Sequence, residues 1–204
     1  MKILVAIPTY ENIYPDTFKS VYELERGGND VMFDFIRGYD CATARNNIVN
    51  RGKEVGADYV LMVDNDVVLP RDVLVNLLEH NEDVVFGFYA HRNAQNRYDG
   101  KTSVCKVGEP NYTQQFTADE LHAHRLIKKN KIQIHGGGMG CALVRMSVFD
   151  KFDYPWFRWT NYSDGGVLSE DLYFCEQCNM AGIPIYVDAR ACCGHLFRCV
   201  EWAL

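Results

Sequence analysis

Two carboxylates spaced for metal binding, Asp64 and Asp66, come directly after a short apolar run, Tyr59–Val63. The run is β-branched and aromatic and has polar residues on both sides, which predicts a buried strand. Side chains at the carboxyl end of such a strand face the crevice in which open α/β sheets bind ligands. Carboxylates one residue apart offer hard oxygen ligands to Mg²⁺ or Mn²⁺, and these ions commonly hold a diphosphate. A solvated acidic turn is the alternative, and the triplet alone does not decide between them.

Two further segments have side chains that could bind a nucleotide beside such an ion. The first predicted strand ends in Pro8, Thr9, Tyr10 and Glu11. An aromatic ring there could stack on a nucleobase, and a hydroxyl could hydrogen-bond to it. Asp40 and Arg45 follow the second predicted strand, and a guanidinium at a helix start could contact a phosphate or a base edge. An ordinary strand exit and a surface helix are the structural alternatives.

The second half of the chain contains a glycine-rich segment, an acidic pair and a histidine. Residues 136–140 lead into an apolar run and could cradle a phosphate or close a tight turn, although their spacing matches neither common phosphate-binding motif. Glu170 and Asp171 begin a helical pattern, where the helix dipole favours acids, yet either could be a general base toward an acceptor hydroxyl. His195 together with the acidic triplet would form a mixed metal site that favours Mn²⁺ over Mg²⁺.

Strand-like and helix-like patterns alternate over the first ninety residues and would position these side chains. Strands are predicted at 2–7, 31–36, 59–63 and 83–89. The first intervening helix is predicted to place Phe18, Val21 and Tyr22 on one face. The second is predicted to begin near Ala42, and the third to follow Pro70. This order predicts a mainly parallel α/β sheet flanked by helices, with right-handed crossovers.

The chain then becomes more polar. Residues 91–116 are predicted to form a long excursion from the sheet, which in a compact domain is often functional. Residues 117–120 match a capping box that opens a short helix ending at Ile127. The aromatic cluster 156–159 could stack on a sugar or base, or could belong to the core or to a lid.

Length, charge and cysteine content limit the class of protein. The 204 residues suffice for one domain, and the net charge of −6 argues against broad non-specific nucleic-acid binding. No apolar stretch reaches the roughly 18–20 residues of a membrane helix. No export signal accompanies the eight cysteines, so reduced thiols and a cytoplasmic location are expected. Cys175 and Cys178 also match a zinc-binding spacing, but they lie in a predicted helix, where buried cysteine is a plain apolar residue.

Taken in order, these motifs resemble the family 2 glycosyltransferases of the GT-A fold, and the resemblance covers nearly the whole chain. It is carried by residues 8–11, Ala44–Asn46, the triplet 64–66, the segment 138–149, the pair 170–171 and His195. The resemblance implies one Rossmann-like GT-A domain over residues 1–204. Within it, residues 1–90 would bind the nucleotide sugar, and residues 91–204 would bind the acceptor and complete the metal site.

The same resemblance implies an activity: metal-dependent hexosyl transfer from a nucleoside diphosphate sugar to an acceptor hydroxyl, with inversion. The ion would be Mn²⁺ or Mg²⁺, and a UDP-sugar is the default donor. Donor-binding residues would be Pro8, Thr9, Tyr10, Glu11, Asp40, Arg45, Asp64 and Asn65. Metal ligands would be Asp66, His195 and, directly or through water, Asp64. Asp171 would deprotonate the acceptor, with Glu170 as the alternative base or as a supporting residue.

Departures from the family pattern leave alternatives open. The acid-rich segment usual after the second strand is replaced by Arg37–Cys41, which weakens the assignment of base recognition. The Q-x-x-R-W motif of processive members is absent, which favours transfer of a single sugar. A retaining glycosyltransferase, a nucleotidyltransferase and a non-catalytic nucleotide-sugar-binding module remain as alternatives. The acceptor is not specified, a nucleic acid included, and neither is the oligomeric state.

Overall fold

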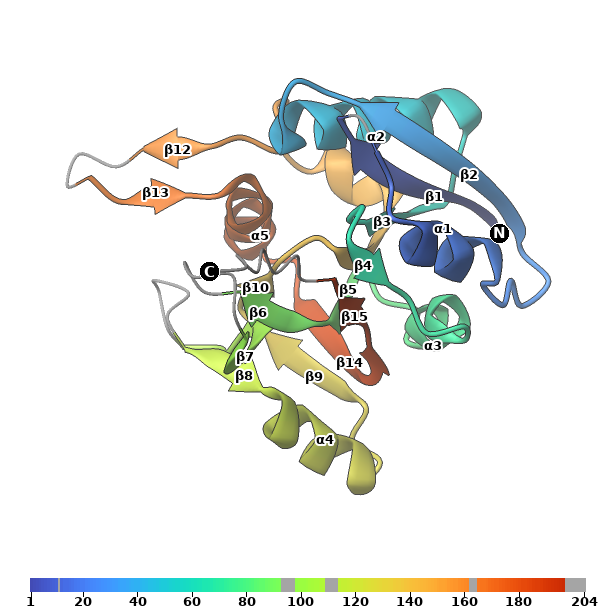
Figure 1. Ribbon diagram of the computed structural model, residues 1–204. Coiled ribbons are helices and arrows are strands. Elements are labelled where there is room, and N and C mark those ends of the chain that lie inside the picture. Colours follow the sequence, from blue (N-terminus) through green and yellow to red (C-terminus); the bar gives the residue numbers. More distant parts are fainter. Residues whose placement is uncertain (11, 93–97, 109–113, 162–164, 197–204) are drawn as a thin grey trace, which may run out of the picture.

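A seven-stranded sheet forms the centre of the molecule, with helices on both faces (Figure 1). The computed structural model describes residues 1–10, 12–92, 98–108, 114–161 and 165–196. In spatial order the strands are β2 (Asp30–Arg37), β1 (Lys2–Thr9), β3 (Tyr59–Val63), β11 (Cys141–Arg145), β5 (Val84–Phe88), β14 (Ile185–Cys192) and β9 (Lys131–Ile134). Five strands run in one direction, whereas β11 and β9 run opposite to their neighbours. The predicted mainly parallel α/β domain is confirmed.

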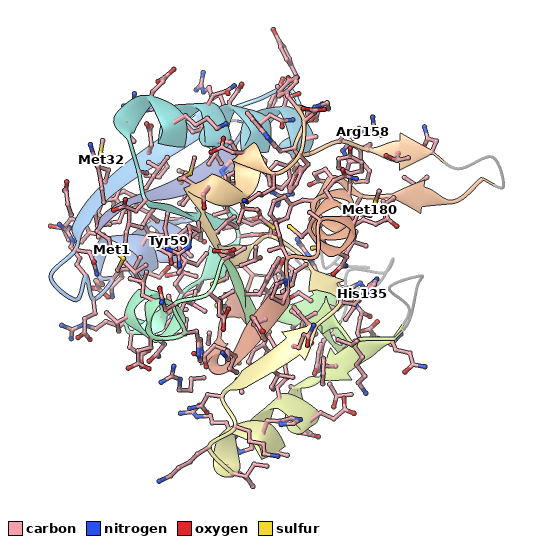
Figure 2. All side chains as sticks on the ribbon, turned by 180° about the vertical axis from the view of Figure 1, so that it is seen from behind. Met1, Met32, Tyr59, His135, Arg158 and Met180 are labelled. Carbon is pink, nitrogen blue, oxygen red and sulfur yellow. The ribbon has the colours of Figure 1, made fainter. Side chains whose placement is uncertain are left out.

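Alternating apolar residues explain why both faces of the sheet are covered. In β1, Leu4 and Ala6 join one apolar cluster, whereas Ile3 and Val5 join the other. Strands buried on both faces read as continuous apolar runs, as β1 and β3 do. Tyr59 of β3 belongs to the second cluster and lies within the body of the molecule (Figure 2). The first cluster is covered by α2 (Cys41–Val55), α5 (Glu170–Met180) and the 3-10 helix η1 (Met146–Asp150), and the second by α1 (Pro15–Tyr22) and α3 (Val73–Glu79).

The first three strands create the crevice that positions the site. From β1 the chain crosses to β2 on one side and then to β3 on the other, and both are parallel to β1. Loops that leave the carboxyl ends of β1 and β3 therefore diverge, and open α/β sheets bind ligands at such a point. Residues 8–10 and 64–66 lie at these two ends.

β11 occupies a central place that its position in the sequence does not reveal. It pairs antiparallel with β3 on one side and with β5 on the other. A strand from the second half of the chain thus separates two parallel strands of the first half. The turn before β11 consequently reaches the same edge of the sheet as the acidic triplet, where the Asp64 N–H donates to the carbonyl of Gly140.

The polar segment 91–116 contains more regular structure than its composition predicts. β6 (Ala90–Arg92), β8 (Gln115–Thr117) and β10 (Gly136–Gly137) each pair antiparallel with β7 (Tyr98–Cys105). Over its described residues, the predicted long excursion is therefore a second, smaller sheet. Such a sheet tolerates polar side chains because one of its faces can remain in water.

Two short strand pairs complete the elements. β4 (Val67–Val68) pairs with β15 (Gly194–His195) beside the triplet. β12 (Thr160–Asn161) pairs with β13 (Val167–Leu168) and projects from the body as a two-stranded ribbon (Figure 1).

One helix presents a different face from the predicted one, and another is as predicted. In α1, Val21 is buried with Thr17 and Ser20, whereas Phe18 and Tyr22 are exposed and stack on each other with ring centroids 6.4 Å apart. The predicted apolar face of α1 is therefore wrong for its two aromatic residues. The capping box at residues 117–120 is confirmed, and it opens α4 (Ala118–Leu126).

Five of the described cysteines are buried and serve the packing: Cys105, Cys141, Cys175, Cys178 and Cys193. Among the described residues no cysteine forms a disulfide. Cys175 and Cys178 are fully buried in α5, and the Cys175 thiol donates to the carbonyl of Gly137 at 3.7 Å. In the part of the chain that the structure describes, none of the helices combines the length and the apolar character that crossing a membrane requires.

A fully buried carboxylate, Asp188, ties β14 to the end of α3. Its Oδ2 lies 2.8 Å from Nε2 of His80 and 2.7 Å from Nη2 of Arg190. Burial alone would raise the pKa of Asp188, but hydrogen bonds from His80 and Arg190 outweigh it and hold the pKa below the ordinary 3.8.

Asp188→Ala should therefore lower the free energy of unfolding by about 3 kcal/mol at neutral pH, since Arg190 would lose its buried partner. A depressed carboxyl pKa stabilises the fold above the ordinary pKa, and this stabilisation is lost as the pH falls through the folded-state pKa. The difference from wild type should shrink as the pH drops below 3.8. Denaturant unfolding at several pH values measures it. Asp150→Ala, which removes the exposed pair with Lys53, is the control and should cost less than about 1 kcal/mol.

Candidate functional site

The acidic turn 64–66 joins β3 to β4 and is fixed by backbone hydrogen bonds. The Val67 N–H donates to the Asp64 carbonyl at 3.1 Å, and the Leu196 N–H donates to the Asp66 carbonyl at 2.9 Å. Pairing of β15 with β4 continues this contact. The end of the described chain is thus held against the turn, which brings His195 next to Asp66.

Asp66 faces a histidine and an arginine with one carboxylate oxygen. Its Oδ2 lies 2.6 Å from Nη2 of Arg92 and 3.5 Å from Nε2 of His195. Burial raises the pKa of Asp66, but the hydrogen bonds and charges of His195 and Arg92 outweigh this effect and hold the pKa below its ordinary value. Asp66 is therefore ionised at neutral pH and available to a cation.

The His195 ring is oriented as a metal-binding imidazole usually is. Its Nδ1 lies 2.7 Å from the carbonyl oxygen of Ala90. That oxygen can only accept, so Nδ1 carries a proton. The charged ring then also donates from Nε2 to Asp66, whereas the neutral ring places a lone pair on Nε2. Nε2 and the Asp66 carboxylate are then two electron-pair donors on one site, and a backbone carbonyl behind the ring is a common support of metal ligands. A carboxylate and an imidazole fit Mn²⁺ by their chemistry.

The third predicted metal ligand, Asp64, does not converge with the other two. Its Oδ1 lies 2.7 Å from Nη2 of Arg45 instead. Within the described residues, no three side chains of the histidine, cysteine, aspartate and glutamate types gather to hold an ion. The chain thus offers the pair Asp66 and His195, and ions of this kind commonly complete their coordination with water and substrate phosphate.

Arg45 lies beneath the site and connects its two acidic segments. Its side chain is 3% exposed, and its Nη1 donates to Glu170 while Nη2 donates to Asp64. Burial opposes the charge on Arg45, but the carboxylates of Asp64 and Glu170 outweigh it and raise the pKa of Arg45. The Arg45 guanidinium holds the end of β3 against the start of α5. Its predicted contact with a base or phosphate stays a prediction.

Arg45→Met should lower the free energy of unfolding by about 3–5 kcal/mol, because two carboxylates would lose their buried partner. Arg45→Met combined with Glu170→Leu should recover part of this loss, since the uncompensated buried charge is then removed. Denaturant unfolding of the two single variants and the double variant measures the coupling. Purely additive losses would contradict the bridging role.

The neighbouring Asn46 is also structural. Its amide nitrogen donates to the carbonyls of Ala42 and Phe157, and its oxygen accepts from the N–H groups of Trp156 and Phe157. These bonds anchor the aromatic segment 156–159 to α2. Trp156 and Phe157 consequently lie in the core, while Trp159 is exposed.

A cavity of about 280 Å³ lies over the switch point between β1 and β3; we call it the donor-side cavity. Its charged lining consists of Asp40, Asp64, Asp66 and Arg92, and residues 8–10 line it as well. The loop at its rim is pinned because the carbonyl of Asn12 accepts from both the Thr9 hydroxyl and the Asn65 amide. Glu11, predicted to belong here, lies outside the described residues.

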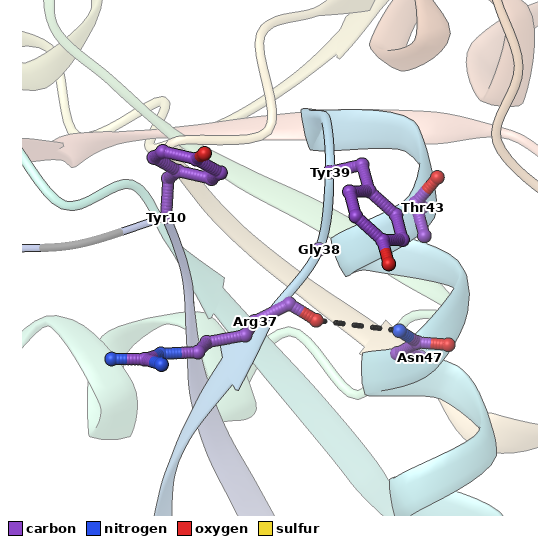
Figure 3. Close-up of a pocket in the computed structure, with 6 residues that line it drawn as sticks. All are labelled: Tyr10, Arg37, Gly38, Tyr39, Thr43 and Asn47. Atoms are coloured by element: carbon purple, nitrogen blue, oxygen red, sulfur yellow. Dashed lines mark hydrogen bonds between the residues drawn. The ribbon is translucent and has the colours of Figure 1, made fainter.

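A wider and more open cavity of about 550 Å³ continues outward from this one and is lined by Tyr10, Arg37, Gly38, Tyr39, Thr43 and Asn47. Tyr10 and Tyr39 stand on opposite sides of it (Figure 3), and both are largely exposed. Exposed aromatic rings facing a shared cavity can stack on a planar ligand. Asp40, in contrast, accepts from the N–H and hydroxyl of Thr43 and so caps α2.

A third cavity, of about 430 Å³, shares Arg92 with the donor-side cavity and is lined by His195; we call it the acceptor-side cavity. Asp171, His195 and Arg92 line it together with β7 residues. Asp171 is held by Oδ1, which accepts from the Ser169 hydroxyl and from the Leu172 N–H. Its Oδ2 accepts from no described residue, so this oxygen can take a proton from a bound molecule. Glu170 instead is buried against Arg45.

The glycines before β11 allow a tyrosine to approach the turn. The Gly140 N–H donates to the Tyr89 hydroxyl at 3.1 Å. A Cβ at Gly138 would lie 2.4 Å from that hydroxyl oxygen, and one at Gly140 would lie 2.8 Å from the ring. The glycines therefore serve close packing against Tyr89. The Tyr89 ring in turn meets the edge of His195, with centroids 5.0 Å apart.

The structure thus places Asp66 beside His195, and His195 lines one cavity with Asp171. Arg45 and Glu170 pair with each other beneath these residues. The sequence interpretation missed Arg92, Tyr39 and Tyr89. Arg92 and Tyr89 sit at the junction of the main sheet with the small sheet, and no motif or spacing singled them out. Tyr39, between a glycine and the helix cap Asp40, could have been noticed as an aromatic residue in a loop.

Solved structures share this fold, and A197 from STIV and GalNAc-T7 are two of them. A197 from STIV matches over 97% of this chain and 87% of its own, with a TM-score of 0.61 and 16% identity. GalNAc-T7, solved with UDP, GalNAc and Mn²⁺, matches over 98% of this chain but only 45% of its own, with a TM-score of 0.66 and 11% identity. At these identities the likeness concerns the fold, which is that of GT-A glycosyltransferases. No protein-family model matches the chain, and no curated protein does.

Proposed function

We propose that this chain is a metal-dependent glycosyltransferase that moves a sugar from a nucleoside diphosphate sugar to an acceptor hydroxyl with inversion. One observation carries the proposal. The donor-side and acceptor-side cavities share Arg92, which pairs with Asp66 on the donor side, while the imidazole of His195 and the carboxylate of Asp171 line the acceptor side. The fold adds support by analogy only, because one fold can host many activities.

The donor would lie over the carboxyl ends of β1 and β3, in the donor-side cavity and the wider cavity beside it. Tyr10 and Tyr39 would stack on the base, and the diphosphate would extend through the donor-side cavity toward Asp66. Residues 1–92 supply all the described lining of these two cavities. We propose on this basis a division into a donor-binding half over residues 1–90 and an acceptor-binding half over residues 91–204.

Asp66 and His195 would hold the metal ion, with Mn²⁺ the better match to a carboxylate and an imidazole. Such an ion, when bound, neutralises the negative charge that develops on a departing diphosphate. Asp64, fixed by Arg45, would orient the ribose or a water beside the ion.

Asp171 would supply the base. Its Oδ2 would accept the proton of the acceptor hydroxyl, whose oxygen forms a bond to the anomeric carbon. The bond from that carbon to the diphosphate breaks on the opposite side, and its electron pair remains on the diphosphate oxygen. An in-line displacement of this kind inverts the anomeric configuration. The Ser169 hydroxyl would hold Asp171 in place through its other oxygen.

A panel of nucleotide sugars tests the proposal. The purified chain is incubated with UDP-, GDP-, ADP- and CMP-linked sugars and Mn²⁺, and the released nucleotide is measured with and without chelator. We expect release from one donor class, lost on chelation and restored by Mn²⁺. Uridine, the base expected from the family resemblance, is one member of the panel. Tight binding of a donor by calorimetry without any release or transfer would instead indicate a nucleotide-sugar-binding module.

A further inference from the structure

Arg92 occupies a position that no motif anticipated, on the boundary between the two cavities. It ends β6 and lines both the donor-side and the acceptor-side cavity. Among the described residues that line these cavities, it is the only lysine or arginine. If a sugar passes from the donor-side to the acceptor-side cavity, the bond between the sugar and the diphosphate breaks near Arg92.

Arg92 also contacts the same carboxylate oxygen that would ligate the ion. Its Nη2 lies 2.6 Å from Oδ2 of Asp66, the oxygen that also faces His195 at 3.5 Å. A divalent cation on this oxygen would repel the guanidinium, and salt and water screen that repulsion less in a partly buried site than at the surface. Binding of the ion at Oδ2 would therefore displace the Arg92 guanidinium.

A guanidinium displaced from Asp66 remains in the donor-side cavity, whose lining it shares. A diphosphate in that cavity would provide a partner for it, because a guanidinium pairs with phosphate oxygens through two parallel hydrogen bonds. The Arg92 side chain is 36% exposed, so its head can rotate without opening the core. The cavity lining is otherwise acidic, with Asp40, Asp64 and Asp66, and a doubly charged ligand needs a positive partner there.

We propose that Arg92 is an exchangeable counter-ion. It pairs with Asp66 while no divalent cation is bound, and it passes to the diphosphate of the donor when the cation takes Asp66. This proposal rests on the proposed function and deepens it. It predicts that Arg92 weakens binding of the ion alone, because both compete for Asp66. It also predicts that Arg92 strengthens binding of the diphosphate when the ion is present.

Binding measurements with Mn²⁺ and inorganic pyrophosphate test this without knowledge of the base or sugar. Calorimetry on Arg92→Ala should show about fivefold tighter binding of Mn²⁺ alone, and about fivefold weaker binding of pyrophosphate in saturating Mn²⁺. Arg92→Lys should bind Mn²⁺ as wild type does and pyrophosphate with intermediate affinity, since lysine keeps the charge but not the planar fork. Lys101→Ala, which removes an exposed cation from the neighbouring strand β7, is the matched control and should change neither affinity.

Opposite changes in the two affinities support the proposal, because a merely structural role for Arg92 would weaken both together. Parallel changes, or no change, in a variant with wild-type circular dichroism and melting temperature would overturn it. Absence of Mn²⁺ binding in the wild type overturns both this proposal and the metal assignment. If wild type binds Mn²⁺ and pyrophosphate and Arg92→Ala behaves as expected, but no nucleotide sugar is consumed, only the proposed transfer reaction fails.

Discussion

Asp66→Ala is expected to reduce sugar transfer and donor hydrolysis by a factor on the order of 10³, because several kcal/mol of charge stabilisation at the leaving diphosphate would be lost and each 1.4 kcal/mol is tenfold. Asp66 is the residue on which the proposed ion, His195 and Arg92 all depend. The fold should persist, since Arg92 is partly exposed and water can solvate its guanidinium once the carboxylate is gone. Initial rates with saturating Mn²⁺ measure the effect.

Two comparisons make this prediction specific to the ion. Mn²⁺ affinity should fall with the rate in Asp66→Ala, while Asp16→Ala, an exposed acid in the first turn of α1, should leave both unchanged. His195→Ala should reproduce a weaker form of the same loss. Full activity of Asp66→Ala at low Mn²⁺ would remove Asp66 from the metal site.

Asp171→Asn is expected to lower the turnover number by about 10²–10⁴-fold, the usual contribution of a positioned general base. An amide keeps the size of the side chain and its contact with Ser169, but it cannot accept a proton from the acceptor hydroxyl. Because Asp171 lines the acceptor-side cavity and not the donor-side cavity, donor affinity should be unchanged. Steady-state kinetics with varied acceptor, together with calorimetry of donor binding, separates the two effects.

Neighbours on the same helix provide the controls for Asp171. Glu176→Gln, further along α5, should be neutral. Glu170→Gln should affect stability more than turnover, because Glu170 is buried against Arg45 beneath the site. Unchanged turnover in Asp171→Asn, with a product of retained anomeric configuration by NMR, would exclude the base and favour the retaining alternative.

Local patterns in the sequence were sufficient for much of the fold. Continuous burial of β1 and β3 follows directly from runs such as Tyr59–Val63, because both faces of a central strand meet apolar neighbours. The capping box at 117–120 is equally local, since each partner bonds the backbone of the other within one turn. The same patterns failed for α1, where Phe18 and Tyr22 have an apolar periodicity but lie on the exposed face.

The sequence by itself determined the mainly parallel sheet and the acidic turn at the end of its third strand. It also set the order of motifs that resembles family 2 glycosyltransferases. Only the tertiary structure decided what each charge does, because the partner of a charged side chain depends on contacts between distant segments. Arg45 is committed to Asp64 and Glu170, and Arg92 reaches Asp66 from the small sheet. The insertion of β11 between β3 and β5 brings the glycine turn and Tyr89 to the same edge. Such long-range pairings leave no periodic trace in the sequence, since strand neighbours need not be neighbours along the chain.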